Sequence, residues 1–219
     1  LDLVASDLDR VRKTHSNRSI FGGSYGWSSA GRFHHAQSQV HRFLNSIGGY
    51  VRHQDSYSLA AARVLMPHIV ASMDELMVMH TPWSVMAEHC KLFVSFGGVP
   101  HKNSQINAGG ATQHHVKGGL YGMRASGVRF VNITPTGDDI DTGGEVEWLA
   151  IRPNTDTALI LALCHMLVAE NLHDKAFLDR CTVGFERFAP SLAGKDAAWA
   201  AQITGIPAPR IVALAREMA

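Results

Sequence analysis

A serine in a glycine-rich turn is the residue whose surroundings are most typical of a reactive site. Gly22-Gly23-Ser24-Tyr25-Gly26 fits the pattern Gly-x-Ser-x-Gly, and it follows a short stretch of strand-forming residues at 19–21. In serine hydrolases this pattern forms a sharp turn that exposes a nucleophilic hydroxyl. Tyr25 and Trp27 place bulky rings beside the serine. Such rings are typical of a pocket whose walls enclose a large cofactor. Both kinds of chemistry stay open at this point, as does a plain glycine-rich turn.

Three later segments combine glycine, hydroxyl and carboxylate residues at the ends of predicted strands. They are Gly97-Gly98, Thr134 with Asp138-Asp139, and Asn154-Thr155-Asp156 before a helix. Glycine lets a ligand approach the backbone, the polar side chains can meet ribose hydroxyls or a purine edge, and a helix N-terminus offers N–H groups to phosphate. Together they predict a nucleotide-binding edge, while each alone also fits a turn or a helix cap. The chain contains neither Gly-x-Gly-x-x-Gly nor the P-loop pattern, which disfavours standard NAD binding and ATP hydrolysis.

The 13 histidines and 3 cysteines do not form a recognisable metal site. The adjacent residues of His34-His35 and of His114-His115 would point in different directions on a helix. Cys90, Cys164 and Cys181 are far apart and lack Cys-x-x-Cys spacing. We therefore expect neither a zinc site nor a disulfide framework, and a reducing compartment fits these cysteines best.

Composition excludes several classes of function. Lys plus Arg number 20 and Asp plus Glu number 19, so a net charge of +1 gives no global field that would recruit nucleic acid or an anionic membrane. With 46% hydrophobic and 18% charged residues, the 219-residue chain should fold as a globular protein. No apolar run approaches the roughly 20 residues of a membrane span. The start, residues 1–4, resembles the middle of an amphipathic helix, which predicts that the chain is part of a longer one.

Hydrophobic periodicity predicts strands that alternate with helices. We expect strands at about 19–21, 92–96, 128–133 and 145–151. We expect helices at about 1–13, 29–45, from 59 onward, 82–88, 112–125, 158–168, 175–181, 196–203 and 207–218. The helix at 158–168 is almost wholly apolar, so it should be buried. This order predicts an α/β fold with a mainly parallel sheet flanked by helices, in which ligands bind beyond the carboxyl ends of the strands.

The chain resembles the dimethyl sulfoxide reductase family of molybdopterin oxidoreductases. Ile20-Phe21-Gly22-Gly23-Ser24-Tyr25-Gly26-Trp27-Ser28-Ser29-Ala30-Gly31 is similar to the family segment that carries a metal-bound serine. Further similar segments follow in the same order at residues 48–50, 55–58, 66–68, 81–83, 153–159, 174–178, 181–182 and 199–216. Residues 12–18 and 109–115 most resemble the biotin sulfoxide reductase branch, with trimethylamine N-oxide and dimethyl sulfoxide reductases next.

This resemblance implies a molybdenum-dependent reductase of S-oxides or N-oxides, with a bis(molybdopterin guanine dinucleotide) molybdenum cofactor. Ser24 would bind the metal, because a hard, high-valent metal favours an anionic oxygen ligand. Tyr25 and Trp27 would shape the approach to the metal. The guanine dinucleotide tail would lie against Gly98, Val99, Ile133, Thr134, Pro135, Asn154, Thr155 and Asp156. Substrates would be of the biotin sulfoxide, methionine sulfoxide, trimethylamine N-oxide or dimethyl sulfoxide type, and the electron donor stays unidentified.

The enzymes of this family are several hundred residues longer, so the resemblance also implies an internal fragment of a larger multidomain molybdoenzyme. Residues 1–52 would end one α/β domain that carries the metal-ligand turn. Residues 53–219 would form an incomplete Rossmann-like domain that binds the dinucleotide cofactor. The remainder of the polypeptide would complete the site, and the fragment alone would be inactive. The resemblance favours the cytoplasm, with the periplasm as alternative, and neither a nucleic-acid partner nor a membrane span is expected.

Two alternatives to this function stay open from the residues alone. One is a serine hydrolase with Ser24 as nucleophile and an acid and a histidine downstream. The other is a non-catalytic nucleotide-binding module in which Ser24 is only a turn residue. Labelling of Ser24 by a fluorophosphonate would favour the first, and guanine nucleotide binding without metal would favour the second.

Overall fold

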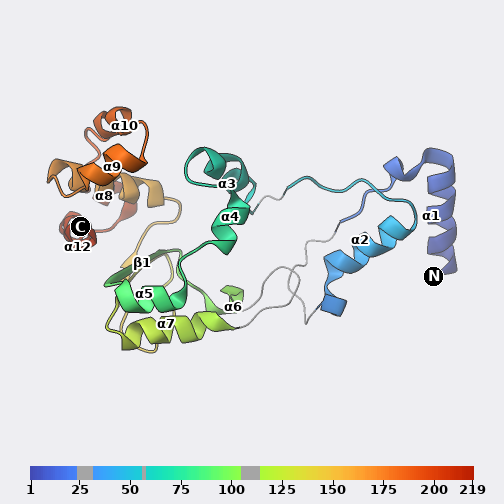
Figure 1. Cartoon of the computed structure of the whole chain (residues 1–219), viewed down its shortest axis with the longest axis horizontal. Helices are drawn as coiled ribbons and strands as arrows, with labels where there is room; N and C mark the ends of the chain where they lie inside the picture. Colours follow the sequence, from blue (N-terminus) through green and yellow to red (C-terminus); the bar gives the residue numbers. More distant parts are fainter. Residues whose placement is uncertain (24–31, 56–57, 105–113) are drawn as a thin grey trace. The chain divides into compact units, whose positions relative to one another are not determined.

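The computed structural model describes residues 1–23, 32–55, 58–104 and 114–219 (Figure 1). The chain forms two compact units. The first unit comprises Leu1–Pro82 and Ser104–His115, and the second comprises Trp83–Asn103 and Val116–Ala219. The domain boundary expected near residue 52 stays a prediction. The first unit contains the segment that leads into Ser24, and the second contains the sheet.

The first unit is built from short helices. They are α1 (Asp2–His15), α2 (Ala36–Ser46), α3 (Ala60–Leu65) and α4 (Met73–Val78), with 3-10 turns at Asn17–Ser19, Arg32–His34 and Met66–His68. The predicted helix at 1–13 is confirmed as α1, which carries an acidic residue in its first turn and basic residues in its last, as the helix dipole favours. The helix predicted from 59 onward is interrupted, since α4 begins anew at a capping box between Ser72 and Glu75.

The strand predicted at 19–21 is reduced to a single pair of residues. Phe21 and Val51 form an isolated parallel bridge, in which Gly22 N donates to Val51 O at 2.9 Å and Val51 N donates to Ile20 O at 2.8 Å. The preceding residues, Asn17–Ser19, form a 3-10 turn instead of extended backbone. The backbone pairing between these two segments is therefore too short to form a strand.

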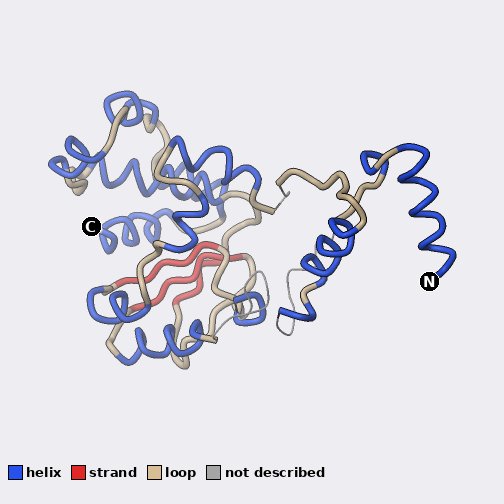
Figure 2. Tube along the Cα trace, turned by 45° about the vertical axis from the view of Figure 1, so that its right-hand side comes forward, coloured by secondary structure: helices blue, strands red, loops and turns tan. Residues whose placement is uncertain are grey.

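The second unit contains a three-stranded parallel sheet in the order β1-β2-β3, drawn red in Figure 2. Its strands are β1 (Leu92–Phe96), β2 (Arg129–Thr134) and β3 (Glu147–Ala150), which confirms three predicted strands. The helix α5 (Trp83–His89) precedes β1, and α6 (His101–Ser104) and α7 (His115–Ala125) lie between β1 and β2. The expectation of an α/β fold with a parallel sheet is correct.

Helices cover both faces of this sheet (Figure 2). Phe130 of β2 packs with Leu120 and Met123 of α7 on one face. On the other face, Val131 and Ile133 join a core formed with α8 (Asp156–Ala169), α11 (Ala197–Thr204) and α12 (Ala208–Met218). Alternate residues of β2 thus point into two apolar layers, as the twofold periodicity of a strand requires.

The apolar helix α8 is buried on one side only. Ala158, Leu159, Ala162 and Leu163 are buried, whereas Ile160 is 44% exposed. The prediction of full burial was therefore correct only for the face toward the sheet. Two further helices, α9 (Lys175–Cys181) and α10 (Phe185–Ser191), follow α8 along the chain. In the described part of the chain, no helix is long and apolar enough to cross a membrane.

Candidate functional site

The carboxyl ends of β1, β2 and β3 lie at one edge of the sheet because the three strands are parallel. The residues expected to contact the dinucleotide tail follow these ends, after β1, at the end of β2 and between β3 and α8. The structure thus brings the three predicted segments to one edge. It also gives them different roles.

The loop after β1 is held against Asp139. Val99 N donates to Asp139 O at 2.7 Å, and Gly97 N donates to Ile133 O at 2.9 Å. A Cβ on Gly98, whose φ is +75°, would lie 2.4 Å from Asp139 Cβ and 2.6 Å from Asp139 O. Gly98 is therefore required for close packing within the protein. The glycine that leaves room for a ligand is Gly97, since, apart from its two chain neighbours, no described residue has an atom within 4 Å of the position its Cβ would take.

Asp139 organises the end of β2. Its Oδ2 accepts a hydrogen bond from Thr134 Oγ1 at 2.8 Å and another from the hydroxyl of Thr136. The hydroxyls of Thr136 and then Thr134 lower the pKa of Asp139, and the charge of Lys102 adds to this effect. The carboxylate therefore stays ionised at neutral pH and presents acceptor oxygens at the edge.

Two of the predicted contact residues are buried. Thr134 donates its hydroxyl to Asp139, and its carbonyl accepts a hydrogen bond from Trp148 Nε1 at 2.8 Å. Ile133 is fully buried in the core, and its carbonyl accepts the hydrogen bond from Gly97 N, so it holds the loop after β1 in place. Pro135, the next residue, is exposed. The sequence could not separate these roles, because they depend on how residues 135–139 turn back toward β2.

The start of α8 has no side-chain cap. Thr155 is the N-cap residue, but its hydroxyl donates backward to Arg152 O at 2.7 Å. Asn154 is exposed with a φ of +64°, and Asp156 lies in the first helical turn. The first N–H groups of a helix have no partner within the helix, so this end is suited to an anionic group.

Arg152 is a residue of this edge that the sequence analysis missed. Its Nη1 donates to Gln202 O at 2.5 Å and to Ile203 O at 3.1 Å, and its backbone N donates to Thr204 O at 2.9 Å. These bonds join the segment after β3 to the end of α11. Arg152 is followed by a proline and belongs to no motif, so the sequence carried no signal for this role.

The residues predicted to act on the metal, Ser24, Tyr25 and Trp27, lie outside the described residues. The described chain ends before them at Gly23 and resumes at Arg32. Within the described ranges, no group of three or more His, Cys, Asp or Glu side chains is placed to hold a metal ion. The assignment of Ser24 therefore stays a prediction.

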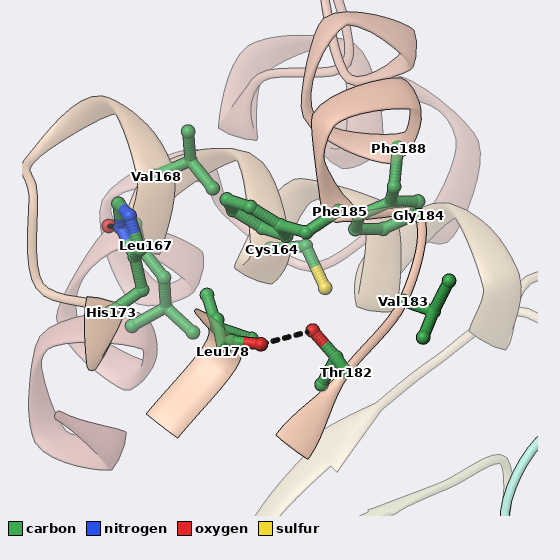
Figure 3. A pocket seen from close by; sticks show the side chains of 10 residues that line it. All are labelled: Cys164, Leu167, Val168, His173, Leu178, Thr182, Val183, Gly184, Phe185 and Phe188. Atoms are coloured by element: carbon green, nitrogen blue, oxygen red, sulfur yellow. Dashed lines mark hydrogen bonds between the residues drawn. The ribbon is translucent and has the colours of Figure 1, made fainter. Parts of the chain in front are cut away.

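A cavity that the sequence analysis did not predict lies between α8, α9 and α10 (Figure 3). Its volume is about 350 Å³, and its lining consists of Cys164, Leu167, Val168, His173, Leu178, Thr182, Val183, Gly184, Phe185 and Phe188. Burial raises the pKa of the Cys164 thiol, so the thiol stays protonated at neutral pH. Thr182 Oγ1 donates to Leu178 O at 2.7 Å, and His173 Nδ1 donates to Leu167 O at 3.3 Å. The lining is thus apolar, with few polar groups.

Comparison with known proteins gives matches over the whole chain. It is 42% identical to the biotin sulfoxide reductase of Cereibacter sphaeroides over 100% of its length, which is 30% of that protein. It is 39% identical to the dimethyl sulfoxide/trimethylamine N-oxide reductase of the same species, over 99% of its length and 27% of that protein. It is 36% identical to the trimethylamine-N-oxide reductase of Haemophilus influenzae (strain ATCC 51907 / DSM 11121 / KW20 / Rd), over 100% of its length and 27% of that protein.

The chain therefore spans less than a third of the length of these curated relatives. Among solved structures, it is similar to the acetylene hydratase from Pelobacter acetylenicus, with a TM-score of 0.49 and 19% identity over 98% of this chain and 26% of that one. Residues 1–216 match the family described as Molybdopterin oxidoreductase. As the resemblance around Ser24 indicates, the chain belongs to the molybdopterin oxidoreductase family.

Proposed function

We propose that this chain is part of a molybdenum-dependent reductase that removes oxygen from S-oxides or N-oxides. The observation that carries this proposal is the 42% identity to a biotin sulfoxide reductase over the entire chain. Relatives named for dimethyl sulfoxide and trimethylamine N-oxide follow at 39% and 36% identity. Substrates of the biotin sulfoxide, trimethylamine N-oxide or dimethyl sulfoxide type follow from these names, and methionine sulfoxide is added from the resemblance noted in the sequence. This family membership favours the reductase over a serine hydrolase or a simple nucleotide-binding module.

The cofactor in this proposal is bis(molybdopterin guanine dinucleotide) molybdenum, with a guanine dinucleotide tail at the strand edge of the second unit. Three features of that edge fit such a tail. Gly97 leaves the backbone open, Asp139 offers carboxylate oxygens to the N–H and O–H donors of a purine or a ribose, and the uncapped start of α8 offers N–H groups to phosphate. The donor set thus suits a base, a sugar and a phosphate.

The packing divides the predicted contact residues into two groups. Gly98, Val99, Ile133 and Thr134 would act by fixing the edge, since they bind one another or Asp139 or lie in the core. Pro135, Asn154, Thr155 and Asp156 would be the direct contacts, because they follow β2 on the surface or begin α8. Asp139 joins this second group.

In the first unit, Ser24 would bind molybdenum through its hydroxyl oxygen, and Tyr25 and Trp27 would line the approach of the substrate. The bound cofactor supplies the oxygen-atom and two-electron transfer. What the chain contributes is an oxygen ligand on a turn and aromatic walls that orient the oxide and exclude water.

The remaining parts of the proposal concern the intact protein. Residues 1–52 would end one domain and residues 53–219 would form most of the dinucleotide-binding domain. The rest of the polypeptide would complete the cofactor site, and a separate electron donor would supply reducing equivalents. We place the protein in the cytoplasm, with the periplasm as the alternative.

The test is metal and pterin analysis of the full-length protein together with the variant Ser24→Ala. We expect bound molybdenum and pterin in the wild type, and a loss of sulfoxide turnover of about 100-fold or more in Ser24→Ala, because the metal loses a fixed ligand. The matched control is Ser28→Ala, which removes a hydroxyl from the same segment and should leave turnover unchanged. Normal turnover in Ser24→Ala would refute the ligand assignment, and fluorophosphonate labelling of Ser24 would favour the hydrolase.

A further inference from the structure

The cavity between α8, α9 and α10 has walls that are fixed within the second unit (Figure 3). His165 Nδ1, on α8, donates to Leu192 O at 3.0 Å, which joins the end of α10 to α8. The ring of His173, between α8 and α9, lies against the ring of Phe185 on α10, with centroids 5.5 Å apart. All three helices are thus tied together around the cavity, which is part of the fold of this unit.

The lining of the cavity suits apolar groups better than polar molecules. None of the described residues that line it is an acid, a lysine or an arginine. The thiol of Cys164 stays protonated at neutral pH, and Thr182 Oγ1 and His173 Nδ1 already donate to backbone carbonyls. A site for a small polar molecule needs a few polar groups that point at its ligand. Apolar side chains need no such partners, and this lining offers mainly hydrocarbon surface.

The size of the cavity matches large side chains. Its volume is about 350 Å³. A cavity of about 150 Å³ is enough to bind a benzene ring. The cavity therefore has room for one or two large apolar side chains.

The mouth of the cavity extends this apolar lining to the surface of the unit. Val183, between α9 and α10, is 99% exposed, and Phe188 on α10 is 41% exposed, although both residues line the cavity. Their neighbours in the sequence, Glu186 and Arg187, have highly exposed side chains that form an ion pair. An apolar centre with a charged rim is the usual composition of a contact between two protein surfaces.

The relatives of this chain indicate where the second surface comes from. The chain spans 30% of the biotin sulfoxide reductase that it matches and 27% of two further relatives. In a parent protein of that length, more than two thirds of the polypeptide lies outside these 219 residues. Segments of one polypeptide meet at a high effective concentration, so they cover an apolar surface more readily than a separate molecule does.

We propose that the cavity between α8, α9 and α10 receives one or two large apolar side chains from the remainder of the parent polypeptide. These side chains fill the space beside Cys164 and Phe185, and the segment that carries them covers Val183 and Phe188. The contact joins the second unit to the rest of the protein. This inference rests on the cavity and on the length of the relatives, so it does not depend on the proposed reaction.

The first test places a charge at the mouth of the cavity in the full-length protein. Because Val183 is almost fully exposed in this chain, the charge in Val183→Asp stays in water unless another surface covers it. We expect amide hydrogen exchange of α9 and α10 to be about 10-fold faster in Val183→Asp than in the wild type, because the covering segment is released. The matched control is Ala176→Asp, which adds the same charge at an exposed position of α9 outside the lining and should leave exchange unchanged. Equal exchange in Val183→Asp and the wild type would overturn the proposal.

The second test identifies the occupant by a photo-crosslink. Replacement of Val183 by p-benzoylphenylalanine keeps an apolar group at the mouth of the cavity in the full-length protein. We expect a cross-link to a peptide outside residues 1–219, within a chain of monomer mass. A link between two copies would make the cavity an interface between copies, and a link within residues 1–219, or none, would leave it without a covering segment. Each of these results overturns the proposal. Neither test measures turnover, so an absence of molybdenum would refute the proposed function and leave this inference to be decided by its own experiments.

Discussion

In the second unit, three parallel strands with helices on both faces place polar residues along one edge, whereas in the first unit a few individual contacts hold the segment before Ser24. Among the described residues of the first unit, only Ile20 and Leu44 are buried hydrophobic residues. In the second unit, the hydrophobic core on one face of the sheet joins the sheet to three helices, α8, α11 and α12. The hydrophobic core therefore fixes the geometry of the nucleotide edge, whereas individual contacts fix the geometry of the segment before Ser24.

This difference predicts opposite sensitivities in the two units. A site supported by a core resists single changes on its surface but fails when the core fails. A site supported by individual contacts loses its geometry after a small local change that costs little stability. Substitutions of the same kind in both units therefore test whether the two units differ in this way.

The largest difference is expected between Leu159→Ala and Leu44→Ala. Leu159 is fully buried in the core around α8. Its replacement by alanine should therefore lower the free energy of unfolding of the second unit by about 2–5 kcal/mol. Leu44 has few buried neighbours in the first unit, so its truncation should cost at most about 2 kcal/mol. Peptide-level hydrogen exchange of the full-length protein measures both. Equal losses in the two units would contradict the claim that the first unit depends on few contacts.

The next difference lies within the edge itself, between Gly98→Ala and Gly97→Ala. Both glycines have positive φ, so alanine brings a backbone strain of roughly 1–2 kcal/mol at either position. Only at Gly98 does the new methyl group also meet the backbone of Asp139, which cannot turn away. We expect Gly98→Ala to lower the unfolding temperature more and to release more guanine nucleotide from the intact protein. If Gly97→Ala is the more damaging to stability, the packing role of Gly98 is wrong.

The same contrast explains how much the sequence could predict. The three strands of the second unit were found within about two residues, because β1 and β2 are apolar runs and the residues around β3 alternate between polar and apolar. The helix α9 was found with its bounds, since Asp174 is a cap whose side chain accepts a hydrogen bond from Phe177 N at 2.9 Å. The helix α10 was missed, because Gly184 before it and Pro190 inside it are ordinarily turn signals.

The site was predictable only at the level of segments. Glycine, threonine and aspartate after strands indicated one edge, because parallel strands end together. Which glycine is open and which is packed depends on Asp139, whose position is set by the turn at 135–139. In the first unit, the backbone hydrogen bonds of Val51 with Ile20 and Gly22 join residues more than 20 positions apart that share no periodicity. Contacts of this kind have no local signal in a sequence.

The smallest difference concerns ion pairs, and it compares Glu147→Gln with Asp9→Asn. Glu147 on β3 binds Arg210 on α12 and Arg129 on β2, with Arg210 Nη2 2.9 Å from Glu147 Oε2. Among the described residues, the partners of Asp9 are neighbours on its own helix, with Arg12 Nη2 2.8 Å from its Oδ1 and Lys13 beside it. Loss of Glu147 should therefore cost about 1 kcal/mol, since it joins a helix to the sheet, whereas the loss of Asp9 should not be measurable in global unfolding.

The acid dependence of stability separates these two carboxylates further. Arg210 and then Arg129 lower the pKa of Glu147 in the folded chain below its unfolded value of about 4.3. Its contribution is therefore fully present above about pH 4.3 and is lost as the pH falls through the lowered folded pKa. Denaturant unfolding of the full-length protein at pH 7 and near pH 3 should show wild type and Glu147→Gln converging in acid. Because Asp9 links no two elements, Asp9→Asn should parallel the wild type throughout, and convergence in that variant instead would place the acid-sensitive contact in the first unit.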